Sequence, residues 1–297
     1  MDVIVKTTNL TKKFKEKVAV DSVNMTIYRG DIYGFIGKNG AGKTSTMKLL
    51  LGLSFPSDGR IELFGEKDLN QARKKIGSLI EAPGLYKNCT AYENMKRFAI
   101  LYGATEEQIH EYLKWVGLDK TKNKKVGQFS LGMKQRLGIA IALLGNPELM
   151  ILDEPINGLD PEGIKEIRDI ILKLNQERGV TFLISSHLLD ELAKIVTRYG
   201  IIHSGVLMEE LTTGELEKRC QNGVKIVTNN MVKAKEILKR YIPQENIQIS
   251  NQTMILNVTS DQAGYFNTLL VENGIEVKEL TIQHGGFEEY FIERIGR

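Results

Sequence analysis

The chain of 297 residues is 42% hydrophobic and 26% charged, which is the composition of an ordinary globular protein. Its length fits a domain of about 200 residues followed by a smaller one. A formal net charge of +3 gives no reason to expect a nucleic-acid partner, and no stretch approaches the roughly 18 apolar residues of a transmembrane helix.

The chain begins with MDVIVKTTNL, which lacks the basic region and long apolar core of a signal peptide. Its two cysteines, Cys89 and Cys220, show neither metal-ligand spacing nor the pattern of a disulfide framework, which suits a reducing compartment. We therefore expect a cytoplasmic protein, unless another component holds it at a membrane.

A glycine-rich segment, GKNGAGKTS, follows the strand-like sequence DIYGFI and precedes the helical sequence TMKLLLG. It has the G-x-x-x-x-G-K-[ST] spacing in the strand-loop-helix context that a phosphate-binding loop requires. Glycines let successive backbone N–H groups point at phosphate oxygens, and the positive end of the following helix adds to the attraction. Lys43 suits the terminal phosphates, and the Thr44 hydroxyl suits Mg²⁺. The residues expected to bind nucleotide here are Gly37, Lys38, Asn39, Gly40, Ala41, Gly42, Lys43, Thr44 and Ser45.

The next segment of interest, SLIEAPGLY, places Glu81 at the end of an apolar run and just before a Pro-Gly turn. A carboxylate in such a loop is commonly a solvated charge without a specific role. Further along, the basic run KTKNKK at residues 120–125 is likewise typical of a solvated turn.

The segment FSLGMKQRLGIA, residues 129–140, predicts a helix that Ser130 caps. Its apolar face would contain Met133, Leu137, Ala140 and Leu144. The N-terminus of this helix offers a second place for an anion. The same pattern also occurs in a well-capped helix that only packs in a core.

Two adjacent acids, Asp153 and Glu154, follow the apolar run LMIL. At the end of a buried strand the chain turns, so both carboxylates can approach one metal-phosphate centre. Asp153 suits a hold on Mg²⁺, and Glu154 suits a general base that activates water for attack on the γ-phosphorus. Acids before a proline can also start a helix, but the glycine-rich segment favours the catalytic interpretation.

Two further polar residues lie next to predicted elements. Asp160 precedes Pro161 at the head of the amphipathic sequence EGIKEIRDIILKLNQERG, which predicts a capped helix start. His187 follows the buried strand VTFLISS, at the edge of the sheet where α/β proteins bind ligands. A lone histidine at such a place is more often a capping or packing residue.

The sequence pattern changes near residue 220. Before it, buried strands alternate with helices, which indicates an α/β core on a largely parallel sheet. After it, the order βαββαβ predicts a small ferredoxin-like appendix. We therefore expect two domains, residues 1–220 and 221–297, and an interaction or dimer-packing role for the second, whose residues show no chemical constellation.

Taken together and in this order, the motifs over about residues 1–220 resemble the ATP-binding subunits of ATP-binding-cassette (ABC) transporters. Phe14 in LTKKF is similar to the aromatic residue that stacks on adenine in that family. Residues 37–44 resemble its Walker A loop, and residues 130–133 its signature loop. The resemblance implies an ATPase that binds ATP and Mg²⁺, with a mixed-sheet core and a helical subdomain.

The later motifs extend the same resemblance. Asp153 and Glu154 resemble the Walker B pair, Asp160 ends a segment similar to the D-loop, and His187 resembles the switch histidine. In such proteins two cassettes pack head to tail, and the signature helix of one caps the γ-phosphate that the other holds. The resemblance thus implies a dimer of cassettes, with a second copy of this chain as the favoured partner.

The signature departs from the family's usual pattern, Leu-Ser-Gly-Gly-Gln, because it reads FSLGM here. Ser130 and Gly132 are retained and are expected to act on the nucleotide of the partner. Leu131 and Met133 replace residues with polar or minimal side chains. At the place where the family usually has a glutamine that reaches Mg²⁺ and the attacking water, this chain has Glu81, which makes it a candidate metal ligand.

Glu81 together with FSLGMKQR resembles the branch of the family that protects cells against bacitracin and lantibiotic peptides. That resemblance implies separate transmembrane permease subunits, which would hold the protein peripherally on the inner face of the membrane. Other half-size drug or polyketide exporters remain an alternative.

A soluble cassette protein of translation or DNA repair is a further alternative. Those proteins generally carry two cassettes or a long coiled-coil insertion, whereas this sequence has one Walker loop and no sustained heptads. A P-loop GTPase is disfavoured because the guanine-reading sequence Asn-Lys-x-Asp is missing. A plain P-loop kinase would leave the signature helix unexplained.

Overall fold

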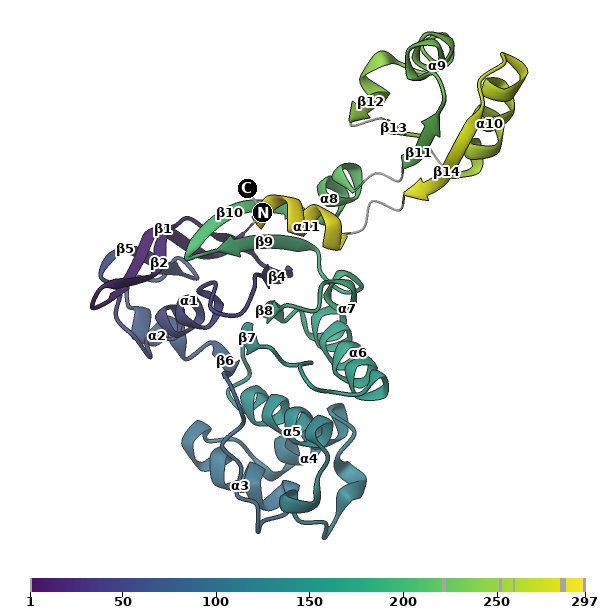
Figure 1. The fold of residues 1–297 in the computed structure, drawn as a ribbon. Helices are drawn as coiled ribbons and strands as arrows, with labels where there is room; N and C mark the ends of the chain where they lie inside the picture. The colour runs from purple at the N-terminus through teal and green to yellow at the C-terminus, as the bar shows by residue number, and fades with distance from the viewer. Residues whose placement is uncertain (1, 221–222, 251–252, 259, 284–286, 296–297) are drawn as a thin grey trace. The chain divides into compact units, whose positions relative to one another are not determined.

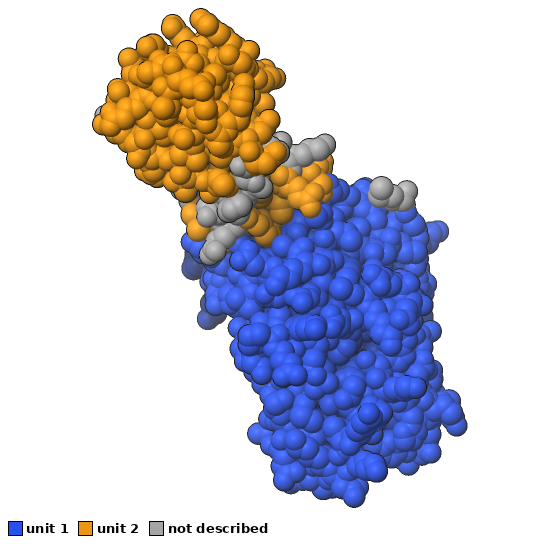
Figure 2. All heavy atoms as spheres, turned by 90° about the vertical axis from the view of Figure 1, so that its right-hand side faces the viewer, with its two compact units in different colours: residues 1–213 blue, residues 214–297 orange. Residues whose placement is uncertain are grey.

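The computed structural model describes residues 2–220, 223–250, 253–258, 260–283 and 287–295. The chain divides into two compact units, residues 1–213 and 214–297, which Figure 2 colours separately. The boundary expected from the sequence lies slightly later, between residue 220 and residue 221, and residue 221 is outside the described residues. The assignment of separate domains to residues 1–220 and 221–297 stays a prediction.

A six-stranded sheet forms the centre of the first unit, in the order β10-β9-β4-β8-β7-β6 (Figure 1). Its strands are β4 (Ile32–Ile36), β6 (Ile76–Leu79), β7 (Leu149–Asp153), β8 (Thr181–Ser186), β9 (Arg198–His203) and β10 (Val206–Thr212). Neighbouring strands are parallel except for β9 and β10. Every residue of β4, β7 and β8 is buried, because helices or a second sheet cover both faces, and this explains their largely apolar sequences.

A second, antiparallel sheet is built on the long strand β1, which pairs with the three others (Figure 1). Its strands are β1 (Val3–Phe14), β2 (Lys17–Val23), β3 (Thr26–Tyr28) and β5 (Asp58–Leu63). One hydrophobic cluster joins the two sheets through helix α1 (Lys43–Leu50), since it contains Leu10 of β1, Met47 of α1 and Ile151 of β7. The mixed-sheet core expected from the sequence is thus present.

Helices complete the first unit, and three of them, α3, α4 and α5, pack on one another (Figure 1). The longer helices are α3 (Ala91–Tyr102), α4 (Glu106–Trp115), α5 (Leu131–Leu143) and α6 (Pro161–Arg178). The shorter ones are α2 (Leu69–Arg73), α7 (Leu189–Ala193) and the 3₁₀ turns η1 (Asp119–Thr121) and η2 (Val126–Gln128). Capping boxes at Thr90 and Thr105 start α3 and α4. None of the helices in the described ranges is long and apolar enough to cross a bilayer.

The second unit contains a four-stranded antiparallel sheet in the order β12-β13-β11-β14. Its elements are β11 (Gly223–Thr228), α9 (Met231–Leu238), η3 (Gln244–Asn246), β12 (Ile247–Ser250), β13 (Thr253–Leu256), η4 (Ser260–Gln262), α10 (Ala263–Glu272) and β14 (Val277–Gln283). This is the βαββαβ order expected from the sequence, with its own apolar core around Ile226, Leu238 and Phe266. Helices α8 (Thr213–Arg219) and α11 (Phe287–Ile295) flank it in the chain.

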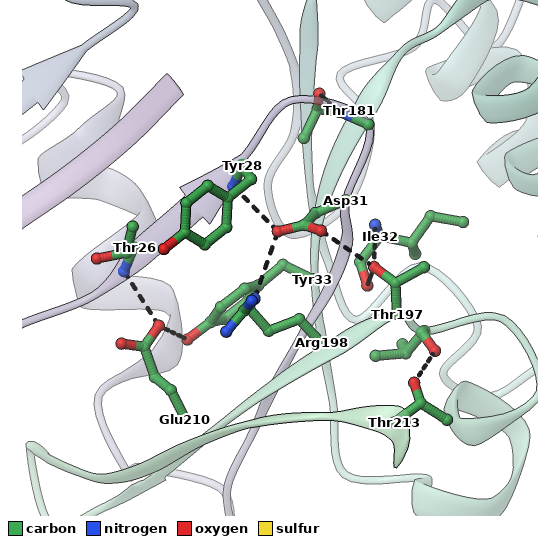
Figure 3. Close-up of polar contacts among 12 residues, drawn as sticks. Thr26, Tyr28, Asp31, Ile32, Tyr33, Thr181, Thr197, Arg198, Glu210 and Thr213 are labelled. Carbon is green, nitrogen blue, oxygen red and sulfur yellow. Dashed lines mark hydrogen bonds and ion pairs between the residues drawn. The ribbon is translucent and has the colours of Figure 1, made fainter. Parts of the chain in front are cut away.

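A polar network joins strand β10 to the core of the first unit (Figure 3). The hydroxyl of Tyr33, which is fully buried in β4, donates to Glu210 Oε1 at 2.8 Å, and the N–H of Thr26 donates to the same oxygen at 3.0 Å. Burial raises the pKa of Glu210 above its ordinary value, and burial together with the charge of Glu210 raises the pKa of Tyr33. A Cβ at Gly200 would collide with the Tyr33 hydroxyl, so this packing requires glycine on β9.

Candidate active site

The loops that carry most of the predicted site residues leave the six-stranded sheet at one edge. Strand β4 ends at Ile36, which is in register with Ser186 at the end of β8. Strand β7 ends at Asp153, which is in register with Ser185, and β6 lies on the other side of β7. Because these strands are parallel, the glycine-rich loop, the acid pair, the histidine and Glu81 all begin at the same edge.

The glycine-rich loop connects β4 to α1, and two of its glycines are required by close contacts. A Cβ on Gly37 would lie 2.5 Å from the carbonyl oxygen of Ile202. At Gly42, which has φ +111°, it would lie 2.6 Å from the carbonyl oxygen of Ala19. The loop therefore runs closely against the neighbouring backbone and leads directly into the N-terminus of α1, where backbone N–H groups are free to bind an anion.

Lys43, the first residue of α1, is 5% exposed. Its ammonium group folds back over the loop and donates to the carbonyl oxygens of Gly37 at 2.5 Å and Lys38 at 3.3 Å. It also lies 3.2 Å from Glu154 Oε1. A buried cation is thus held over the loop between backbone oxygens and a carboxylate, and its positive charge is the feature that would attract a phosphate.

The carboxylate of Asp153 is buried and has a hydroxyl partner on each oxygen. Thr44 Oγ1 donates to its Oδ2 at 2.7 Å, and Ser185 Oγ donates to its Oδ1 at 2.6 Å. The sequence predicts three metal ligands, Thr44, Asp153 and Glu81. The structure brings Thr44 and Asp153 into direct contact.

Glu154 follows in a left-handed conformation, with φ +50°. Its Oε2 lies 2.8 Å from His187 Nδ1. Its Oε1 is buried and, within the described residues, has no hydrogen-bond partner, since the 3.2 Å approach of Lys43 lacks hydrogen-bond geometry. The predicted base and the predicted switch histidine are thus in direct contact, and one carboxylate oxygen is left able to accept a proton or a hydrogen bond.

A cavity of about 210 Å³ opens in front of these groups. It is lined by Lys17, Ala19, Asn39, Gly40, Gly42, Lys43, Thr44, Ser45 and Glu154. The glycine-rich loop, the cation and the orphaned carboxylate oxygen fit the phosphates of a nucleotide and an attacking water. The Thr44-Asp153 pair fits Mg²⁺, which binds to one or two protein oxygens and completes its shell with phosphate and water. No group of three or more His, Cys, Asp and Glu residues able to hold a metal occurs in the described part of the chain.

Phe14 ends strand β1 and is 51% exposed, with Lys12 Nζ 4.9 Å from its ring centroid. It is paired across the β1-β2 hairpin with Lys17, which lines the cavity. The aromatic face that the sequence analysis assigned to adenine therefore belongs to the hairpin that forms one wall of the cavity.

Glu81 lies beyond the end of β6 with φ +60°, and its side chain is 67% exposed. Its Oε1 accepts from Lys48 Nζ on α1 at 2.7 Å, and this hydrogen bond lowers the pKa of Glu81. Glu81 is thus ionised and tethered to the helix that carries Thr44. The structure pairs it with Lys48, and within the described residues it makes no direct hydrogen bond to Thr44 or Asp153.

The signature and D-loop residues lie together, away from the cavity. Ser130 caps α5 and accepts from the N–H of Met133 at 3.2 Å, and Asp160 caps α6 and accepts from the N–H of Gly163 at 3.1 Å. A Cβ on Gly132 would lie 3.8 Å from Gly163 Cα, so the two helix starts are neighbours. None of these residues lines the cavity at the glycine-rich loop.

A larger cavity, of about 310 Å³, lies at the opposite edge of the sheet, where residues 148 and 180 precede β7 and β8. Both of its arginines are already paired, Arg29 with Glu148 and Arg178 with Glu111. Size alone therefore does not make it the active site, and the smaller cavity has the reactive groups.

Three residues of the site were not predicted, and one of them, Ala19, lines the cavity from strand β2. Lys17 lines the cavity from the β1-β2 hairpin, and no sequence motif contains it. Ser185 contacts both members of the acid pair. A hydroxyl residue directly after the run TFLI, two positions before a histidine at the sheet edge, was the available signal for it.

Comparisons with known proteins agree with this geometry. The family model described as ABC transporter matches residues 20–157. The bacitracin transport ATP-binding protein BcrA of Bacillus licheniformis is 46% identical over 302 residues, which cover 100% of this chain and 98% of the relative. The lantibiotic transport ATP-binding protein SrtF of Streptococcus pyogenes is 46% identical over 207 residues, 70% of this chain and 90% of the relative. Among solved structures, a dimeric ATP-binding cassette in a post-hydrolysis state, bound to ADP and phosphate, superposes with a TM-score of 0.63 at 28% identity, over 71% of this chain and 99% of its own.

Proposed function

This chain belongs to the ATP-binding subunits of ABC transporters and is an ATPase, and we propose that it powers the export or removal of membrane-active peptide antibiotics of the bacitracin or lantibiotic type. The observation that supports this substrate class is the 46% identity to a bacitracin transport protein over the full length of both chains. That similarity includes the second unit, so it is not a property of the nucleotide-binding cassette alone.

For nucleotide binding, we propose that residues 37–45 and the Lys43 ammonium hold the phosphates of ATP, and that Phe14 stacks on the adenine. Thr44 and Asp153 would hold Mg²⁺, which when bound offsets negative charge on the phosphate oxygens. The supporting observation is that Lys43 and Thr44 both line the cavity. The hydroxyl of Thr44 also donates to the carboxylate of Asp153.

For hydrolysis, we propose that Glu154 accepts a proton from the attacking water. The orphaned Oε1 is the oxygen with capacity for that proton, while the contact of Oε2 with His187 fixes the orientation of the carboxylate. Lys43 Nζ, 3.2 Å from Oε1, places a positive charge beside the proposed base. His187 would thus hold the proposed base in place through its contact with Oε2.

For assembly, we propose a head-to-tail pair of cassettes in which Ser130, Gly132 and Asp160 of one copy complete the nucleotide site of the other. The supporting observation is that these residues form one patch that does not line its own chain's cavity. Leu131 in the same patch is 47% exposed, an apolar side chain available for a contact between copies. The dimeric cassette among the similar solved structures supports the pairing of two cassettes.

For transport, we propose separate transmembrane permease subunits that select the peptide and hold this protein at the inner face of the membrane. Glu81 is followed by the loop APGLYKNC, which would contact the permease. Glu81 would thereby connect the permease to the proposed metal-binding residues. Its Lys48 partner on α1 provides a physical connection to the helix that carries Thr44.

A complementation experiment tests the function. The gene is deleted from its host, and the minimal inhibitory concentrations of bacitracin and of a lantibiotic are measured with the wild-type gene or with Glu154→Gln supplied in trans. We expect the wild type alone to restore resistance. Equal sensitivity of the deletion strain and its parent to both peptides would contradict the proposed substrate class, without touching the assignment as an ATPase.

A further inference from the structure

Ser185 is the one side chain of the described residues that is hydrogen-bonded to both members of the acid pair. Its Oγ donates to Asp153 Oδ1 at 2.6 Å and accepts from the backbone N–H of Glu154 at 2.8 Å. The serine is fully buried in β8, in register with Asp153 of the neighbouring strand β7. Its donor and one of its acceptor sites are thus both used on the residues that the proposed mechanism needs.

The bond to Asp153 decides how that carboxylate is oriented. With Oδ1 committed to Ser185, Oδ2 is the oxygen that faces Thr44, at 2.7 Å from its hydroxyl. Without the Ser185 bond, the carboxylate would be free to rotate about its side-chain bonds and would leave a buried oxygen unpaired. The relative placement of the two proposed metal-holding groups therefore depends on a hydroxyl from the adjacent strand.

The bond to Glu154 supports an unfavourable backbone conformation. A glutamate at φ +50° is in the left-handed region, which is costly for a residue with a Cβ and persists where the surroundings hold it. Ser185 accepts the N–H at this turn, and His187, two residues further along the same strand exit, contacts the Glu154 carboxylate at 2.8 Å. One short segment, residues 185–187, thus fixes both the backbone and the side chain of the proposed base.

We propose that Ser185 is a positioning residue for ATP hydrolysis, setting the metal-holding and base carboxylates in their relative places through one hydroxyl. This inference rests on the proposed roles of Asp153 and Glu154. Thr181 on the same strand shows the contrasting, purely structural role. Its hydroxyl accepts the N–H of Gly30 at the opposite edge of the sheet and contacts neither acid.

The test compares Ser185→Ala and Ser185→Cys, which lose or weaken the hydrogen bonds, with Ser185→Thr, which keeps the hydroxyl. Thr181→Val is the matched control, since it removes another buried hydroxyl of β8 far from the acids. For each full-length protein, kcat and KM for ATP are measured, together with the melting temperature. We expect kcat to fall by about 10- to 100-fold in Ser185→Ala and Ser185→Cys, with KM within about threefold, and Ser185→Thr to recover most of the rate.

A binding measurement keeps the inference separate from the proposed function. Affinity for the fluorescent, non-hydrolysable analogue mant-AMPPNP is measured with EDTA and with Mn²⁺, which requires no turnover. The gain in affinity that Mn²⁺ confers should shrink in Ser185→Ala and persist in Thr181→Val. An unchanged kcat and an unchanged Mn²⁺ effect in Ser185→Ala would overturn the inference, as would equal losses in the Thr181→Val control. A wild-type protein without ATPase activity would instead count against the catalytic roles, and the Mn²⁺ comparison would still decide the role of Ser185.

Discussion

At the scale of single residues, the proposed roles in binding ATP and in hydrolysing it fall on different side chains around Glu154. Lys43 and the glycine-rich loop are proposed to hold the phosphates, while the Glu154 carboxylate contacts His187 at 2.8 Å. The Glu154 carboxylate can therefore be neutralised while the hydrogen bonds of Lys43 to the loop remain. Sequence motifs predicted the residues of the candidate site but not its geometry. The left-handed turn at Glu154 and the contact between Lys48 and Glu81, 33 positions apart, are set by packing.

Replacing Glu154 with Gln is expected to abolish steady-state hydrolysis and leave ATP binding intact, since loss of a positioned base costs on the order of 10² to 10⁴ in rate. The amide preserves the shape of the side chain but cannot accept the proton. Phosphate release and mant-ATP affinity, measured on one preparation, give the comparison, and size-exclusion chromatography with ATP and Mg²⁺ should show an accumulated dimer. Turnover close to that of the wild type would remove Glu154 from the mechanism.

Glu81→Gln is expected to change basal ATP hydrolysis by about tenfold or less, which corresponds to roughly 1.4 kcal/mol, but to impair peptide resistance in cells more severely. The substitution removes an ionised partner of Lys48, whose hydrogen bond holds the Glu81 pKa below its ordinary value. Lys48→Gln is the matched variant, because it breaks the same contact from the other side. Full resistance in both variants would return Glu81 to the role of a solvated loop charge.

At the scale of elements, the strands were the most predictable part. Strands β4, β7 and β8 are buried along their whole length, so hydrophobicity alone identified them. Caps were also readable, since Ser130 and Asp160 accept the backbone N–H bonds that their positions implied. What could not be read is how the elements meet: the sequence does not say that the starts of α5 and α6 are neighbours, or that β10 returns to the core through Glu210.

The buried Glu210, which attaches β10 to the core, should make the free energy of unfolding depend on pH. The folded-state pKa of Glu210 is raised from 4.5 by burial, so the native state retains a proton that the unfolded chain has lost. Its contribution to stability is complete below the unfolded pKa and is lost as pH rises through the folded pKa. Glu210→Gln keeps an oxygen for Tyr33 and Thr26 but cannot ionise, so its melting temperature relative to the wild type should increase as pH rises from about 4.5 to 8. The exposed Glu177→Gln on α6 is the control, and a parallel pH profile for all three proteins would contradict the assignment.

At the scale of the whole molecule, the chain combines a cassette with a small unit that has its own core. We expect a chain ending at residue 220 to bind ATP with an affinity within about threefold of the full-length protein, because every residue that lines the cavity lies before that point. Self-association or assembly with the membrane subunits should weaken. Equilibrium binding of mant-ATP and sedimentation velocity measure the two effects, after circular dichroism has established that the shortened chain is folded. Loss of ATP affinity in a folded truncation would assign the second unit to the nucleotide site.

The separation of the Ser130-Asp160 patch from the cavity of its own chain has a consequence for control. In the proposed pair, a solitary copy holds its nucleotide with only half of the walls needed for turnover. A single copy can therefore bind ATP without hydrolysing it, and hydrolysis begins only when it pairs with a second ATP-bound copy. In this arrangement, ATP hydrolysis by unpaired copies is limited by their incomplete site, and no separate inhibitor is needed.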